Sequence, residues 1–239
     1  MIGTLINVAT ILIGGVMGML FGARLPERVR QTVVIGLGLF TAAIGVQMAI
    51  KMQQPLVVLG SLLVGGILGE WWQIEEGLRN LGAWLEKRFA SSPEGDQGNG
   101  GSRFIRGFLT ASLVFSIGPI AILGAIQDGL KGDYSLLAIK AVLDGFASLA
   151  FASSLGVGVL FSSLPILVYQ GGISLLAAQA STVFTNPMMN EMTAAGGILL
   201  VGISISGLLE IKPIRVGNFL PALALAPLMM YILAWLHVL

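Results

Sequence analysis

The chain alternates between long apolar runs and short polar segments. The runs are about 15 to 25 residues long, which is the length that an α-helix needs to cross the hydrocarbon core of a bilayer. We expect spanning helices at residues 2–21, 31–50, 55–69, 107–126, 134–155, 157–178, 188–209 and 220–239. The pattern therefore predicts an all-α integral membrane protein, a polytopic bundle of about eight transmembrane helices in a single domain covering residues 1–239.

The apolar stretch 134–182 is the hardest to divide. It has about the length of two spans, and we divide it at Gly156-Val157-Gly158 because glycines are the available breakers. A re-entrant segment is the alternative. Gln170-Gly171-Gly172 is expected to interrupt the sixth span. At the start of the seventh, Asn190 and Glu191 are interpreted as a solvated helix start, with a gate or an ion ligand as the alternative.

Two polar segments follow the third span. In residues 71–89, apolar residues recur at helical spacing while charged residues occupy the other face, which predicts an amphipathic helix on the cytoplasmic side. This helix either lies in the membrane interface or packs on its own protein. Residues 91–102 are rich in Ser, Gly and Pro, and this composition predicts a flexible linker.

The basic residues are distributed unevenly between the loops, and cytoplasmic loops are the ones enriched in Lys and Arg. The loops on one side hold only Lys51 and Lys131. The segments on the other side hold Arg24, Arg28, Arg30, Arg79, Lys87, Arg88, Arg103, Arg106, Lys212 and Arg215. We therefore predict that both termini face outward, away from the cytoplasm.

Composition narrows the possible chemistry. Hydrophobic residues make up 55% of the chain and charged residues 10%, against roughly 25% charged in an average soluble domain, so the lipid bilayer is the main expected partner. Cysteine is absent, which excludes disulfides and cysteine-based metal sites, and the net charge of +1 argues against nucleic acid. No protease motif, phosphate-binding loop or catalytic triad is found. We expect no metal, no cofactor and no enzyme activity.

Glycine is abundant, with 33 residues, and several lie four apart on one helix face, including Gly14 and Gly18, and Gly65 and Gly69. Such rows let helix backbones approach closely in lipid, either within one chain or between the subunits of a homo-oligomer. Residues 5–18 also align with residues 56–69 without gaps. The alignment indicates an internal repeat of helical hairpins, or else a chance similarity between glycine-rich helices.

Polar residues inside the spans carry most of the functional information, because burying them in lipid is costly. Lys140 and Asp144 lie four residues apart on one face of the fifth span, with Asp144 about 15 Å from its outer end. They are interpreted as part of a solute or ion site. A purely structural ion pair is the alternative.

The fourth span contains Ser116-Ile117-Gly118-Pro119 near its middle. Proline removes a backbone donor and clashes with the carbonyl four residues earlier, so we expect a broken helix with freed carbonyls. Transporters use such breaks to build binding sites, although a packed kink without chemistry is the alternative. Ser116, Gly118, Pro119 and Gln170 are candidate site residues. Asp128 lies in an acidic outer segment that is expected to be solvated, and a role in a vestibule is possible for it.

Three of these motifs together resemble the YqgA-like bacterial inner-membrane proteins: residues 116–129, Lys140-Ala141-Val142-Leu143-Asp144-Gly145, and Gln170-Gly171-Gly172. The resemblance extends from Gly3-Thr4-Leu5-Ile6-Asn7 to Asn218-Phe219-Leu220-Pro221. That family is described as a domain of unknown function. The resemblance implies a bacterial cytoplasmic-membrane protein and supplies no catalytic residues.

The leading functional hypothesis is a transporter or channel-like protein for a small solute or ion. One alternative is a non-transporting sensor or assembly component that acts through the amphipathic helix. A lipid-modifying enzyme is the third hypothesis.

The charge asymmetry makes the topology testable. Reporter fusions after residues 27, 96 and 239 are expected to report cytoplasm, cytoplasm and outside, because the basic loops are retained inside. A cytoplasmic signal from the fusion after residue 239 would contradict the eight-span arrangement.

Overall fold

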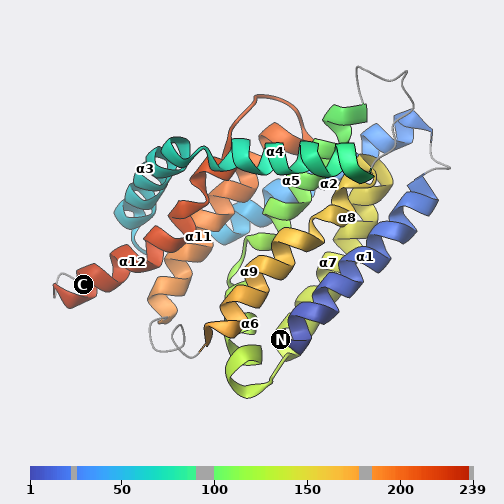
Figure 1. Ribbon diagram of the computed structural model, residues 1–239. Coiled ribbons are helices and arrows are strands. Elements are labelled where there is room, and N and C mark those ends of the chain that lie inside the picture. The colour runs from blue at the N-terminus through green and yellow to red at the C-terminus, as the bar shows by residue number, and fades with distance from the viewer. Residues whose placement is uncertain (23–25, 90–99, 178–184, 237–239) are drawn as a thin grey trace. The chain divides into compact units, whose positions relative to one another are not determined.

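The computed structural model describes residues 1–22, 26–89, 100–177 and 185–236, and every regular element in these ranges is helical (Figure 1). The α-helices are α1 (Ile2–Gly22), α2 (Glu27–Ala49), α3 (Pro55–Trp72), α4 (Ile74–Phe89), α5 (Gly100–Ser116), α6 (Pro119–Lys131), α7 (Ser135–Leu155), α8 (Gly158–Phe161), α9 (Ser163–Leu175), α11 (Asn186–Ile203) and α12 (Pro221–Trp235). The π-helical turn η1 (Ser204–Leu208) continues α11, and the 3₁₀ turn η2 (Val216–Phe219) precedes α12.

The described part of the chain contains 7 single helical segments that are long and apolar enough to cross a membrane. A further candidate is the pair α5 and α6, which are bent by 65° across a short break. The predicted all-α membrane fold is therefore confirmed, with 7 or up to 8 candidate spans.

The division of the long apolar stretch is confirmed at Gly156. This residue ends α7 with a φ of 81°, a conformation that favours glycine, and the next candidate span follows at Gly158–Leu175. The predicted interruption at Gln170-Gly171-Gly172 is wrong, because α9 runs through these residues without a break. Two glycines do not stop a helix whose backbone hydrogen bonds have no competitor in lipid.

The amphipathic helix begins later than predicted. Trp71 and Trp72 still belong to α3, which ends at Gln73 in a left-handed conformation with φ 53°. Within α4, Leu85 is buried in a cluster with Phe104 and Phe108 of α5. The helix therefore packs on its own protein.

The two sides of α4 differ in exposure. Gly82 is buried, and a Cβ built there would touch Phe108 at 3.0 Å. Leu81 and Trp84, by contrast, remain exposed. Of the predicted linker, residues 91–99 lie outside the described residues, whereas residues 100–102 form the first turn of α5.

The described chain divides into two compact units. Unit 1 comprises residues 1–37, 78–116 and 120–181, and therefore holds α1, α5 and α7 to α9, with most of α4 and α6. Unit 2 comprises residues 38–77, 117–119 and 182–239, and holds α3, α11 and α12. The two segments that align in sequence, 5–18 and 56–69, thus belong to α1 in unit 1 and to α3 in unit 2.

In unit 1, a row of glycines brings α1 against the backbone of α7, and the two helices lie side by side in Figure 1. A Cβ built at Gly14 would lie 2.1 Å from the Gly145 carbonyl oxygen, and one at Gly18 would lie 2.2 Å from the Leu149 carbonyl oxygen. Residue numbers rise together along the contact, so the helices are parallel. No side chain larger than hydrogen fits at these positions without separating the helices.

In unit 2, the aligned glycines of α3 have the same use. A Cβ at Gly65 would lie 2.6 Å from the Ala222 backbone nitrogen, and one at Gly69 would lie 1.8 Å from the Asn218 carbonyl oxygen. Here the residue numbers run in opposite directions, so α3 is antiparallel to η2 and α12. Both repeated helices therefore pack through their glycine face, although the partner helix is parallel in unit 1 and antiparallel in unit 2.

We predict that Gly14→Ala destabilises the protein by about 1 to 3 kcal/mol, because the added methyl group forces two backbones apart. Gly36→Ala is the matched control, since it places the same methyl group on a helix with nothing within 4 Å. Thermal unfolding in detergent measures both. Equal melting temperatures for the two variants would show that the α1–α7 contact accommodates a methyl group without loss of stability.

Candidate functional site

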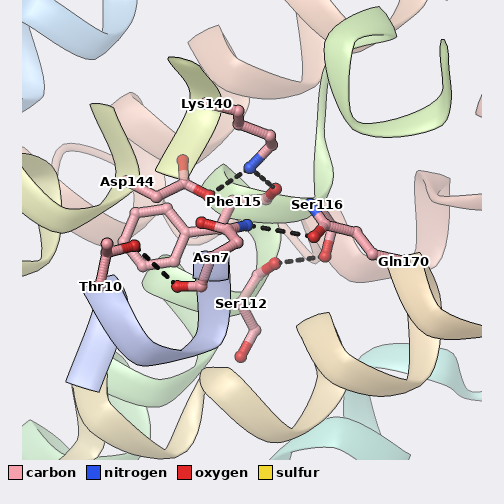
Figure 2. Close-up of polar contacts among 8 residues, drawn as sticks. All are labelled: Asn7, Thr10, Ser112, Phe115, Ser116, Lys140, Asp144 and Gln170. Atoms are coloured by element: carbon pink, nitrogen blue, oxygen red, sulfur yellow. Dashed lines mark hydrogen bonds and ion pairs between the residues drawn. The ribbon is translucent and has the colours of Figure 1, made fainter. Parts of the chain in front are cut away.

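The predicted pair on α7 is buried and ionic. Lys140 and Asp144 are 7% and 8% exposed, and the Lys140 ammonium group is bonded to Asp144 Oδ2. Their spacing of four residues places both side chains over the same face of the helix, where they can meet. The Lys140 Nζ also donates to the Phe115 carbonyl oxygen at 2.8 Å (Figure 2).

The Phe115 carbonyl is available because of the break in the fourth span. In an unbroken helix it would accept from the backbone N–H four residues later, but that residue is Pro119, which has none. The Ser116 hydroxyl donates to the Ser112 carbonyl at 2.7 Å, and Gly118 has a φ of 139°. The predicted break is therefore present, and Lys140 supplies the donor that proline lacks. Gly118 and Pro119 themselves belong to unit 2.

Two amides extend the site from the ion pair. Asn7 of α1 donates through Nδ2 to Gln170 Oε1 of α9 at 3.1 Å, and it lies near the Asp144 side chain. Asn7 and Gln170 are both 0% exposed. Lys140, Asp144, Ser116 and Gln170 are thus gathered in unit 1 as four of the predicted site residues, with Asn7 between them (Figure 2).

Sequence reasoning did not select Asn7. It lies on the same helix face as Gly14 and Gly18, at spacings of seven and eleven residues, and this face is the one packed against α7. An amide in line with a glycine row was the available signal, since such a row marks the buried side of a spanning helix.

The site has unused hydrogen-bonding capacity. Asn7 Oδ1 and Gln170 Nε2 are buried and have no hydrogen-bond partner among the described residues. One is an acceptor and the other a donor. No group of three or more Asp, Glu, His or Cys residues in the described chain is placed to hold a metal ion.

Asp128 lies apart from this cluster, and its expected solvation is wrong. It is 3% exposed on α6, and its Oδ2 accepts from the Gly3 backbone N–H at 3.0 Å and lies 3.0 Å from the terminal ammonium nitrogen. The first N–H groups of a helix have no partner within it, and a carboxylate complements their positive end. In contrast, Asp133 is exposed, and hydrogen bonds from Ser135 lower the pKa of its carboxyl group.

Glu191 has the same role in unit 2. It was interpreted as part of a solvated helix start, but it is 0% exposed, and its Oε1 accepts from the backbone N–H groups of Gln53 and Gln54, each at 2.9 Å. These groups directly precede α3, with Gln54 at the N-cap position. Extending the sequence repeat back by two residues aligns Gly3 with Gln54. At both aligned positions the backbone N–H therefore donates to a buried carboxylate.

The helices, their apolar surfaces and the charges buried within them define a multi-pass α-helical membrane protein. The chain belongs to the family described as "Protein of unknown function (DUF554)", which it matches over residues 2–231.

Two relatives match along nearly their whole length. The uncharacterized protein YqgA of Escherichia coli (strain K12) is 36% identical over 238 residues, which cover 98% of each chain. The uncharacterized membrane protein YdfK of Bacillus subtilis (strain 168) is 28% identical over 237 residues, which cover 98% of this chain and 97% of the relative. No solved structure matches the chain.

We predict that Glu191→Ala lowers the free energy of unfolding by about 1 to 3 kcal/mol, because two backbone N–H groups lose their acceptor. Glu191→Gln keeps an oxygen acceptor and is expected to lose less. Glu76→Ala, which removes an exposed carboxylate from α4, is the control. Thermal unfolding in detergent compares the three, and equal losses for Glu191→Ala and Glu76→Ala would contradict the capping role.

Proposed function

We propose that the protein is a transporter or channel-like protein for a small solute or ion, and that Asp144, Lys140, Asn7 and Gln170 form its binding site. The observation that carries the proposal is the buried ion pair on α7 that is bonded to the freed Phe115 carbonyl of a broken span. Ser116 shapes the end of α5, whereas Asp128 belongs to the start of α1 and is left out of the binding site.

Energetics favour a functional role for the pair. A charged residue near the centre of a spanning helix costs about 2.5 to 3.5 kcal/mol on insertion scales, and well-packed apolar residues often replace a buried ion pair without loss of stability. Charges in such positions commonly mark the path of a solute or ion. The buried ion pair is therefore better explained by a binding site than by helix packing.

The broken helix adds a second argument. Secondary transporters place discontinuous helices at the middle of the membrane, where freed backbone groups contact the solute or its coupling ion. The Phe115 carbonyl lies at such a break and is held by a lysine that could exchange it for a ligand. A lysine that can leave this carbonyl when a ligand binds is suited to a site that opens and closes.

The membrane and orientation are part of the proposal. The similarity to bacterial relatives favours the bacterial cytoplasmic membrane, and the distribution of Lys and Arg favours both termini outside. Under that orientation, α4 lies on the cytoplasmic side.

A non-transporting sensor or assembly role is the second candidate. It is favoured by the exposed side of α4, where Leu81 and Trp84 are 41% and 58% exposed while Leu85 anchors the helix to α5. A partner that binds α4 would depend on Trp84 and would be indifferent to Asp144. Variants of these two residues therefore separate the candidates.

A deletion strain grown across a panel of ions, organic acids and neutral solutes supplies the phenotype, and variants are then tested for its rescue. We predict that Asp144→Asn lowers stability, because Lys140 loses its counter-charge, and abolishes rescue although the protein still folds and inserts. The double variant Asp144→Asn, Lys140→Met is expected to be stable and inactive. Asp133→Asn, at an exposed aspartate, is the control and should rescue fully.

A purely structural role differs in the double variant. Removing one partner of a buried pair costs about 3 to 5 kcal/mol of stability and removing both restores most of it, and with a structural role rescue returns together with stability. Thermal stability in detergent is measured beside rescue for each variant. Recovery of rescue in the double variant would assign the pair to structure and remove the main support for transport.

A further inference from the structure

The two amides at the centre of the site are incompletely paired. Two primary amides can exchange two hydrogen bonds, each giving one and accepting one. Asn7 and Gln170 share only one, from Nδ2 to Oε1, which leaves Asn7 Oδ1 as an open acceptor and Gln170 Nε2 as an open donor. Buried polar atoms without partners are uncommon, because each loses its hydrogen bonds to water without replacement.

The open atoms do not depend on how the amides are turned. Turning one amide alone would set two oxygens or two nitrogens against each other and break the bond. Turning both re-forms the bond in the reverse direction and again leaves one donor and one acceptor open. The pair is therefore a hydrogen-bonding site of fixed type, with one group to give and one to receive.

The helices hold the two amides in place. One turn after Asn7, the Ile11 carbonyl accepts from the Ser148 hydroxyl of α7 at 2.7 Å. One turn after Gln170, the Ser174 hydroxyl donates to the Ala125 carbonyl of α6 at 2.9 Å. Both side chains therefore extend from helices fixed in unit 1, and closing the second amide hydrogen bond would require moving these anchors.

The surroundings carry no net charge. Lys140 and Asp144 neutralise one another, and α1 and α9 contain no charged side chain. An ion that entered would leave water without meeting an unpaired counter-charge, which is strongly unfavourable in a buried site. An uncharged solute with its own donor and acceptor would satisfy both open atoms.

We propose that the site binds an uncharged solute of the carboxamide or urea type, which donates to Asn7 Oδ1 and accepts from Gln170 Nε2. This inference rests on the proposed transport function and narrows its substrate class. The recognised group has an N–H and a C=O side by side, as the open atoms require. Trapped water is the competing occupant, since ordered waters commonly satisfy buried polar groups.

The test uses the full chain reconstituted in phosphatidylethanolamine and phosphatidylglycerol vesicles. Stopped-flow light scattering follows the entry of urea and of lactamide, and separate flux assays follow Na⁺, K⁺, chloride and phosphate. Entry of urea or lactamide is expected to be at least tenfold faster than in protein-free vesicles. Ion fluxes are expected to equal those of protein-free vesicles.

Variants tie the effect to the amide pair. Gln170→Met has nearly the same length and removes the open donor without adding a charge, so it is expected to fold and to lose the urea flux. Asn7→Leu and Gln170→Leu remove the open atoms outright and should also lose it. Gln47→Leu, which removes an exposed amide from α2, should leave the flux unchanged.

The outcomes separate the two proposals. Ion flux without urea or lactamide flux would overturn the uncharged-solute inference and leave transport standing. Absence of every flux from a protein that remains folded would count against both. Urea flux that survives Gln170→Met would mean that the open atoms hold only water, and would place the solute elsewhere. The melting temperature of each variant shows that a lost flux does not come from unfolding.

Discussion

The site follows from one missing hydrogen-bond donor. In lipid every backbone polar group must find a partner within the protein, and Pro119 cannot supply the N–H that the Phe115 carbonyl would otherwise receive. Lys140 donates instead, and its charge can be buried because Asp144 lies one turn away. Asp144 also lies near Asn7, which donates to Gln170. A set of polar groups therefore extends from the freed carbonyl of α5 through α7 and α1 to α9.

The same requirement acts where the two repeated helices begin. The N–H groups at the start of α1 and just before α3 have no partner within these helices, and in each case a buried carboxylate accepts from them. Asp128 serves α1 within unit 1 and Glu191 serves α3 within unit 2. Farther along, both helices use glycines at aligned positions to meet a neighbouring backbone, Gly14 in one and Gly65 in the other. Backbone satisfaction and close backbone contact therefore shape both units.

Local patterns in the sequence predicted the features that depend on neighbours in the chain. Apolar length identified the spans, Pro119 identified the break, and the four-residue spacing of Lys140 and Asp144 placed them on one face. Features that depend on a distant partner were missed. Nothing near Glu191 in the sequence indicates that its carboxylate accepts from the N–H groups of Gln53 and Gln54, far away in the chain. Asn7 likewise becomes a site residue only because α9 brings Gln170 to it.

The repeat also separates what packing requires from what is specific to the site. Thr10 and Ser61 occupy aligned positions, and each donates its hydroxyl to the carbonyl three residues earlier, at 2.9 and 2.8 Å. Those carbonyls belong to Asn7 and Val58, which are also aligned. In unit 2, Val58 is 1% exposed and packs in a wholly apolar cluster with Ala194, Ala195 and Ala226. Because valine satisfies packing at this position of the repeated helix, the fold itself does not require an amide there. The buried Asn7, whose Oδ1 has no hydrogen-bond partner among the described residues, therefore indicates a role in unit 1 that the corresponding position of α3 does not have.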